Sequence, residues 1–318
     1  MRGVPAPHLQ DFLSQINELI AIAKAEGIKP SPQMARARLE GLSAFVSFVP
    51  DIAFSESRRL RINSCDIPVA VYSPRPSQKL PVVLYFHGGG HMCGGVDLYD
   101  PMCRKLALAG NCVVISVDYK LAPEFPYPNG LRDAQHVLEN FDKVLTGVEF
   151  ENTIILAGDS AGGAMCSTLT SWSISAIETP IHAQILIYPS VDYTMGLPSV
   201  EENGEGYFLE KTRIQWYFDN YFANGENAKD VSPLYMPLPK NGPDTLVITA
   251  GCDPLKDEGQ KYAERCSAQG FHTEHYCFEN MIHAFMNIED LCPQECQTLY
   301  ARIGDFIQSV QTRKKLNY

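Results

Sequence analysis

Ser160 lies in the stretch AGDSAGG, directly after the apolar run TIIL. The glycines on either side, Gly158 and Gly162, permit a sharp turn from a strand into a helix, and such a turn exposes the serine hydroxyl. A serine in front of a helix more commonly serves only as its N-cap. Here the helical stretch AMCSTLTSWSIS follows a strand-like run, which is the context of a nucleophile elbow. We therefore predict that Ser160 is a nucleophile.

A run of three glycines after another apolar run is the second candidate for chemistry. Gly88, Gly89 and Gly90 follow PVVLYFH. Glycines let a backbone approach a ligand closely with its N–H groups exposed, and acyl transfer needs such donors for the oxyanion. A flexible turn has the same pattern, but the presence of the serine elbow favours an oxyanion hole. We expect His87 to order this loop rather than act as a base, because it lies beside the donors.

A nucleophilic serine needs a histidine base, and on an elbow of this kind the histidine follows the serine in the chain. Four histidines follow Ser160. Only His283, in FENMIHAF, comes just after the carboxyl end of an apolar run, whereas His182, His272 and His275 lie before or inside such runs. We predict His283 as the base.

The acid that orients this histidine is predicted at Asp253, one turn after the run TLVITA. Asp192, in YPSVD, holds the equivalent place after the preceding run and is the rival candidate. Glu279 is too close to His283 in the chain to reach round to it. The pattern favours Asp253 and leaves Asp192 as the alternative.

Short apolar runs rich in β-branched residues position all of these side chains. The runs are PVVLYF, CVVISV, TIILA, AQILIY and TLVITA, each followed by a turn and a helical stretch. Strands that are apolar throughout and alternate with helices are typical of a mostly parallel sheet buried on both faces. RLRINSCDIPVAVYSP adds two strands joined by a turn, TEHYCF one more strand, and PQECQTLYARIGDFIQSV a closing helix. The predicted fold class is α/β, with ligands beyond the carboxyl ends of the strands.

Two segments lie outside this alternation. Residues 1–50 contain apolar positions at helical spacing over 8–27 and a second helical stretch at about 32–48. The segment at about 192–235 is too long for one crossover and contains the aromatic-rich helix YFLEKTRIQWYFDNYF. We expect both segments to form a cap on a catalytic domain of residues 51–318.

The composition argues against several functional classes. The 318 residues carry a formal net charge of −11, and basic residues cluster only in RRLR and RKK, so nucleic-acid binding is not expected. The ten cysteines lack disulfide-framework or zinc-finger spacing, with CPQEC the nearest approach, so we expect no metal and a reducing compartment. The sequence contains neither a signal-peptide core nor a run of about 18 apolar residues. A soluble cytoplasmic protein without membrane binding is the expectation.

Together these motifs resemble the hormone-sensitive-lipase family of carboxylesterases, within the α/β-hydrolases. The resemblance covers about residues 75–315 and rests on HGGG, DYKLAPEFPYP, GDSAGG, DPLKDEG and HAF, in that order. GDSAGG places the chain with the GDSAG group of the family. The resemblance implies an eight-stranded mostly parallel sheet under a helical cap. It also implies hydrolysis of carboxylic esters, commonly with short- to medium-chain acyl groups, without metal or cofactor.

The resemblance also assigns residues to the site. The nucleophile, acid and base fall on Ser160, Asp253 and His283. The residues expected in the oxyanion hole are Gly88, Gly89, Gly90 and Ala161, with Gly89 and Gly90 the best donors. The residues expected in the substrate pocket are His91, Asp159, Tyr188, Phe208 and Trp216.

Two positions depart from the family pattern. His91 stands where an aromatic residue usually follows the glycine run, and Ala284 stands where a glycine usually follows the catalytic histidine. Many bacterial members dimerise through the sheet edge, so a homodimer is a further expectation. The expected partner is a small-molecule ester.

Other hypotheses share these motifs. An amidase, a lactonase or a deacetylase would use the same triad, because pocket shape and leaving-group contacts set the substrate. A non-catalytic small-molecule receptor of the same fold would carry a damaged triad. The histidine at position 283 argues against the receptor.

Overall fold

Eight strands form one sheet within residues 2–62 and 65–316, which the computed structural model describes. Their order is β1-β2-β4-β3-β5-β6-β7-β8. The pairs β1–β2 and β2–β4 are antiparallel, and all other neighbours are parallel. The strands are β1 (Phe54–Ile62), β2 (Cys65–Ser73), β3 (Leu80–Phe86), β4 (Val113–Val117), β5 (Phe150–Asp159), β6 (Ala183–Ile187), β7 (Asp244–Cys252) and β8 (Thr273–Ile282).

This sheet confirms the predicted α/β class and its mostly parallel pairing. The turn predicted between the first two strands falls on residues 63–64, outside the described residues. Every residue of β3, β4 and β6 is buried, which explains why these runs are apolar throughout instead of alternating.

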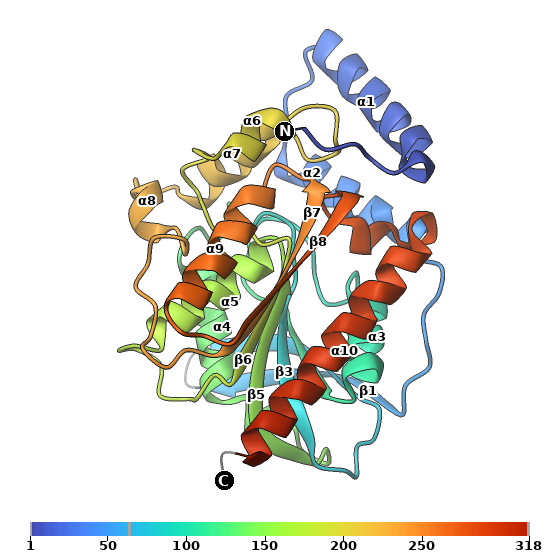
Figure 1. Cartoon of the computed structure of the whole chain (residues 1–318). Helices are drawn as coiled ribbons and strands as arrows, with labels where there is room; N and C mark the ends of the chain where they lie inside the picture. The colour runs from blue at the N-terminus through green and yellow to red at the C-terminus, as the bar shows by residue number, and fades with distance from the viewer. Residues whose placement is uncertain (1, 63–64, 317–318) are drawn as a thin grey trace.

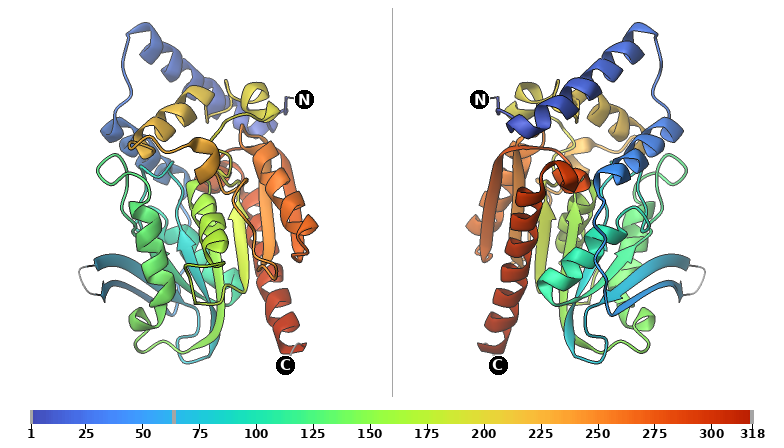
Figure 2. Two further views of the ribbon diagram at one scale, coloured as in Figure 1. Left: turned by 90° about the vertical axis from the view of Figure 1, so that its left-hand side faces the viewer. Right: turned by 90° about the vertical axis from the view of Figure 1, so that its right-hand side faces the viewer.

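Helices cover both faces of the sheet, and successive strand residues point to opposite faces. Val83 and Tyr85 pack in one cluster with α3 and α10, whereas Val82 and Leu84 pack in a second cluster with α4, α5 and α9 (Figures 1 and 2). These helices are α3 (Asp100–Gly110), α4 (Asn129–Glu139), α5 (Ala161–Trp172), α9 (Lys256–Ala268) and α10 (Pro293–Leu316). Short 3-10 turns occupy Pro7–Leu9, Gly41–Phe45, Phe141–Val144 and Phe285–Leu291.

Further helices lie beyond the carboxyl ends of the parallel strands (Figures 1 and 2). They are α1 (Gln10–Ala25) and α2 (Pro32–Glu40) from the N-terminal segment, and α6 (Pro198–Glu202) and α7 (Lys211–Tyr221) from the segment between β6 and β7, which also holds α8 (Ala228–Val231). We call α1, α2, α6 and α7 the helical layer. None of the described helices combines the length and the hydrophobicity that crossing a membrane requires.

Direct hydrogen bonds join the two parts of the helical layer. The backbone N–H of Gly3 donates to Asn203 Oδ1 at 3.2 Å, and the Tyr207 hydroxyl donates to the Gly3 carbonyl at 2.8 Å.

The helix α2 begins at Pro32 because Ser31 caps it: the Ser31 hydroxyl accepts a hydrogen bond from Met34 N–H at 3.3 Å. The predicted stretch at about 32–48 is therefore a shorter α-helix followed by a 3-10 turn.

Candidate active site

Ser160 occupies a strained turn between β5 and α5. Its φ of 53° and ψ of −117° lie outside the regions that non-glycine residues usually adopt. The turn is tight enough that a Cβ at Gly162 would lie 1.8 Å from the Phe86 carbonyl oxygen. Only glycine lets the start of α5 approach the end of β3 this closely. The sequence thus forms the sharp strand-to-helix turn that AGDSAGG predicts, with Ser160 at its apex.

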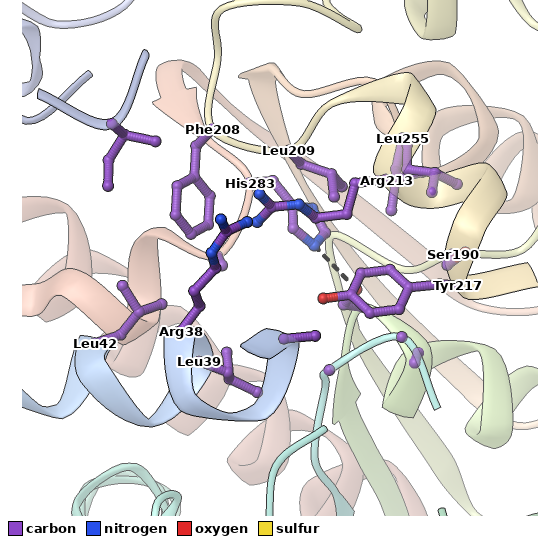
Figure 3. Close-up of a pocket in the computed structure, with 18 of the residues that line it drawn as sticks. Arg38, Leu39, Leu42, Ser190, Phe208, Leu209, Arg213, Tyr217, Leu255 and His283 are labelled. Carbon is purple, nitrogen blue, oxygen red and sulfur yellow. Dashed lines mark hydrogen bonds between the residues drawn. The ribbon is translucent and has the colours of Figure 1, made fainter. Parts of the chain in front are cut away.

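Three predicted residues meet in one hydrogen-bonded chain. His283 Nε2 lies 2.9 Å from Ser160 Oγ, and His283 Nδ1 lies 2.7 Å from Asp253 Oδ2 (Figure 3, dashed line from His283). All three side chains are buried, and Asp253 is completely inaccessible. The other Asp253 oxygen, Oδ1, accepts a hydrogen bond from Leu255 N–H at 2.8 Å, which fixes the orientation of the carboxylate.

Asp192, the rival acid, is engaged elsewhere. Its Oδ1 accepts hydrogen bonds from the N–H and the hydroxyl of Thr194, at 2.9 and 2.6 Å, and its Oδ2 accepts one from the Tyr235 hydroxyl at 3.1 Å. These bonds tie Asp192 to the loop after β6. Of the two candidates, the structure brings only Asp253 to His283.

Two glycines of the loop, Gly89 and Gly90, line the same cavity as Ser160. Among the described residues, none accepts a hydrogen bond from the N–H of Gly89 or Gly90. Gly89 has a φ of 119°, and a Cβ there would lie 2.2 Å from the Cys93 carbonyl oxygen, so this turn requires glycine. Ala161 opens α5, where the first N–H groups of a helix lack partners within the helix.

Gly88 differs from the prediction. Its N–H donates to Asp159 Oδ1 at 2.7 Å, so it has no free donor for a ligand. Asp159 also accepts hydrogen bonds from the hydroxyls of Tyr85, at 2.7 Å, and Tyr99, at 3.2 Å. Burial raises the pKa of this carboxyl, while the three donors oppose the shift. Asp159 borders the cavity, but its hydrogen bonds hold the glycine loop against the end of β5.

His87 also supports the loop, as its position in the sequence suggests. Its ring stacks between Tyr99 and Tyr119, with centroid separations of 5.3 and 4.4 Å, and its Nδ1 lies 2.8 Å from the Gly88 carbonyl oxygen. Burial lowers the pKa of His87 to about 4. A neutral His87 donating from Nδ1 to the carbonyl fits these contacts.

A cavity of about 460 Å³ opens above Ser160 and His283, beneath the helical layer. This volume lies within the range of small-molecule pockets. Aliphatic side chains of α1 and α2, Leu42 of the 3-10 turn after α2, and aromatic side chains of α7 line part of its wall, as Figure 3 illustrates with Leu39, Leu42 and Tyr217. The site therefore combines a serine hydroxyl hydrogen-bonded to a histidine, backbone N–H groups without partners among the described residues, and a largely apolar volume.

Comparisons with known proteins point to the same chemistry. A family model described as alpha/beta hydrolase fold matches residues 83–287. The chain belongs to the α/β-hydrolase fold family. It is 33% identical to carboxylesterase NlhH of Mycobacterium tuberculosis over 282 residues, covering 86% of this chain and 87% of that protein. It is 30% identical to ethyl acetate hydrolase of Pseudomonas putida over 232 residues, covering 70% and 72% of the two chains.

Solved structures give the same result for this α/β-hydrolase. The hyperthermophilic esterase of the archaeon Pyrobaculum calidifontis superimposes with a TM-score of 0.84 at 31% identity, covering 97% of this chain and 99% of that one. The comparisons confirm the predicted family and the predicted class of enzyme, a carboxylic ester hydrolase.

Two residues predicted in the substrate pocket lie outside the main cavity of this α/β-hydrolase. Tyr188 is buried, and its ring packs on His283 with centroids 4.9 Å apart at 60°. Trp216 lines a smaller adjoining cavity. Its neighbour Tyr217 faces the main cavity and lies against Gly90, where a Cβ would come 2.6 Å from the tyrosine ring. Phe208 lines the cavity, as predicted.

The two departures from the family pattern have clear structural settings in this α/β-hydrolase. Ala284 adopts a left-handed conformation with φ of 60° and ψ of 27°, the region that favours glycine. His91 lines the cavity and stacks on Tyr221 with centroids 3.9 Å apart and an interplanar angle of 5°. Burial, with a smaller contribution from His87, lowers the pKa of His91 to about 3. The residue thus fills the place of an aromatic side chain as a neutral ring.

His91 should make the stability of the protein depend on pH. In the unfolded chain a histidine takes up its proton near pH 6.5, but folded His91 does so only near pH 3. The unfolded chain therefore binds more protons between these values, so stability is full above pH ~6.5 and falls as the pH drops toward ~3. His91→Phe keeps a ring on Tyr221 and removes this proton uptake.

The free energy of unfolding should fall between pH 7 and pH 4 in both proteins. We expect this fall to be smaller in His91→Phe than in the wild type, by on the order of 2 kcal/mol. Urea unfolding at several pH values measures this difference. Equal pH dependence of the two proteins would contradict the buried neutral histidine.

The cysteine pair of CPQEC forms a sulfur contact inside the core. Cys292 Sγ and Cys296 Sγ lie 3.9 Å apart, and both residues are buried. Across residues 2–62 and 65–316, no group of three or more His, Cys, Asp or Glu side chains is arranged to hold a metal ion.

Proposed function

We propose that this α/β-hydrolase is a serine carboxylesterase that cleaves short- to medium-chain acyl esters through an acyl-enzyme on Ser160. The observation that carries the proposal is the continuous hydrogen-bonded chain from Asp253 through His283 to Ser160. Its three members come from the carboxyl ends of three strands, and no side chain has to move for Ser160 to lose its proton. The esterases among its relatives support the same conclusion.

The first half of the reaction acylates the serine. Neutral His283, with its proton on Nδ1, accepts the Ser160 proton at Nε2 while Oγ attacks the ester carbonyl carbon. Asp253 holds the tautomer and stabilises the imidazolium. When the tetrahedral intermediate collapses, the bond between the acyl carbon and the alkoxy oxygen breaks, and His283 gives its proton to the leaving alcohol.

The second half returns the enzyme to its starting state. A water molecule loses a proton to His283 and attacks the acyl carbon, and the bond to Ser160 Oγ breaks. His283 then returns the proton to Ser160, and the carboxylic acid leaves. In both halves the N–H groups of Gly89, Gly90 and Ala161 would bind the oxyanion, and we omit Gly88 because Asp159 already accepts its N–H.

The cavity supports a preference for acyl groups of limited length. Its wall is mainly aliphatic, and α1 and α2 lie over it. We propose that residues 1–50 and about 192–235 act together as the cap, because both contribute side chains to this wall. The homodimer stays a prediction.

Hydrolysis of p-nitrophenyl esters from acetate to palmitate tests the proposed function. We expect kcat/KM to peak at short to medium chains and p-nitroanilides of the same acyl groups to react far more slowly. Anilides or lactones that react as fast as the esters would favour the amidase or lactonase hypothesis. Absence of turnover on every ester, with folded protein, would contradict the proposal and revive the receptor hypothesis.

A further inference from the structure

Two arginines reach into the cavity that holds Ser160. Arg38 extends from α2 and Arg213 from α7, so they belong to the two separate chain segments of the helical layer. Figure 3 shows the two guanidinium groups with their ends toward one another. Both residues line the main cavity and also the adjoining cavity of about 220 Å³. The two cations therefore lie where these cavities meet.

Neither arginine has an acidic partner among the described residues. No carboxylate lies within ion-pairing distance of either guanidinium, and no described acceptor takes a hydrogen bond from either side chain. By contrast, the basic residues two positions earlier on the same helices do have acidic partners. Arg36 of α2 pairs with Glu124 at 2.5 Å, and Lys211 of α7 pairs with Glu201.

The acidic side chains that line the two cavities, Asp159 and Glu210, are already engaged. Glu210, on the wall of the adjoining cavity, lies 3.5 Å from Lys24 Nζ. Asp159, beside Ser160, accepts three hydrogen bonds from Tyr85, Gly88 and Tyr99. The meeting point of the two cavities thus keeps an excess of positive charge.

The two positive charges lie close enough to influence each other. Two like charges repel across a partly apolar space, and the pKa of Arg38 is lowered, first by burial and then by the positive charge of Arg213. A planar anion between the guanidinium groups would relieve the repulsion and could accept paired N–H donors from each arginine.

We propose that Arg38 and Arg213 bind a carboxylate carried by the substrate, so that the preferred esters are monoanions with an apolar body, such as half-esters of dicarboxylic acids. This inference rests on the proposed function of Ser160. A carboxylate fits better than a phosphate dianion, because most of the cavity wall is apolar and a dianion costs more to desolvate. Arg38 is exposed and Arg213 half-buried, so the charged end keeps some contact with water while the ester reaches Ser160.

Matched pairs of esters test this assignment. One pair carries the charge on the acyl side, monomethyl adipate against dimethyl adipate. The other carries it on the alcohol side, butanoyloxyacetate against its methyl ester. The quantity measured is the ratio of kcat/KM for the anionic ester to kcat/KM for its neutral counterpart, by pH-stat. The neutral ester reports any general damage to the site.

In the wild type we expect this ratio to exceed one for at least one pair, by about tenfold. Arg38→Gln and Arg213→Gln should each lower it by roughly tenfold, the effect of losing one charge-assisted hydrogen bond. Arg38→Lys should restore part of it. Lys211→Gln is the matched control, since it removes the same charge from α7 outside the cavity, and it should keep the wild-type ratio.

Three results would overturn the assignment. They are a wild-type ratio at or below one for both pairs, a ratio unchanged in both arginine variants, and an equal fall in Lys211→Gln, which would reflect net charge alone. If the arginine variants do not fold, inhibition of methyl hexanoate hydrolysis in the wild type decides: adipamate, the monoanion with one amide end, should inhibit well below the concentration at which neutral adipamide does, and equal inhibition contradicts the proposal. These results differ from a failure of the proposed esterase function. If that function were wrong, the wild type would hydrolyse neither the anionic esters nor the neutral ones.

Discussion

Ser160→Ala should lower kcat for ester hydrolysis by roughly 10⁶-fold, the scale on which loss of a triad nucleophile acts. The reason is that Oγ, 2.9 Å from His283 Nε2, is the atom that forms the acyl-enzyme in the proposed mechanism. Alanine keeps the Cβ that the strained turn already accommodates, so the melting temperature should change little. Steady-state kinetics on the best p-nitrophenyl ester measures the effect.

A second serine of the same helix is the control. Ser171→Ala also deletes one hydroxyl from α5, but that hydroxyl donates to the Pro237 carbonyl, away from the cavity. We expect kcat within severalfold of the wild type. Retention of more than 1% of wild-type activity in Ser160→Ala, in a preparation free of wild-type enzyme, would place the nucleophile elsewhere.

Asp253→Asn should lower kcat by about 10⁴-fold, as loss of the correct histidine tautomer does in a triad. Asp253 Oδ1 accepts the Leu255 N–H, so the amide oxygen of asparagine should stay there. The amide NH₂ then faces His283 Nδ1 and forces the histidine proton onto Nε2, toward Ser160. In that tautomer His283 cannot accept the serine proton. Kinetics beside a folding check, such as thermal unfolding, measures the loss.

Asp192→Asn tests the rival acid with the same chemical change. The amide can keep an acceptor toward Thr194 and donate to the Tyr235 hydroxyl, which accepts as well as donates. We expect kcat within tenfold of the wild type. If Asp192→Asn were the more damaging variant for kcat, with both proteins folded, the assignment of Asp253 as the acid would be wrong.

Local chain signals explain why the three proposed triad residues, which the structure brings together, could be selected from the sequence. Ser160, Asp253 and His283 each come just after an apolar run, and the carboxyl ends of parallel strands meet at one edge of the sheet. The family resemblance added the order of the motifs. Position after a strand end did not separate Asp253 from Asp192, because both follow strand ends. The family resemblance assigned the acid to Asp253, and the hydrogen-bond partners of the two carboxylates distinguish them directly.

The directions in which side chains and backbone N–H groups point could not be predicted in the same way. Neighbouring helix positions point about 100° apart, so Trp216 and Tyr217 look equivalent in sequence but face different cavities. The N–H of Gly88 turns toward Asp159 because of backbone torsions that three identical glycines do not reveal. The approach of Arg38 to Arg213 depends on the docking of two distant segments, for which the sequence carries no local signal.

Covalent labelling of Ser160 tests the central claim most directly. A p-nitrophenyl alkylphosphonate resembles the tetrahedral intermediate, and attack by Oγ releases one p-nitrophenolate and leaves a stable phosphonate ester on the serine. The mechanism predicts one adduct per chain in the intact mass, located on Ser160 by peptide mass spectrometry, with parallel loss of ester hydrolysis. Ser160→Ala should take up none. An adduct on another residue that tracks the loss of activity, or full inactivation without an adduct on Ser160, would contradict the acyl-serine mechanism.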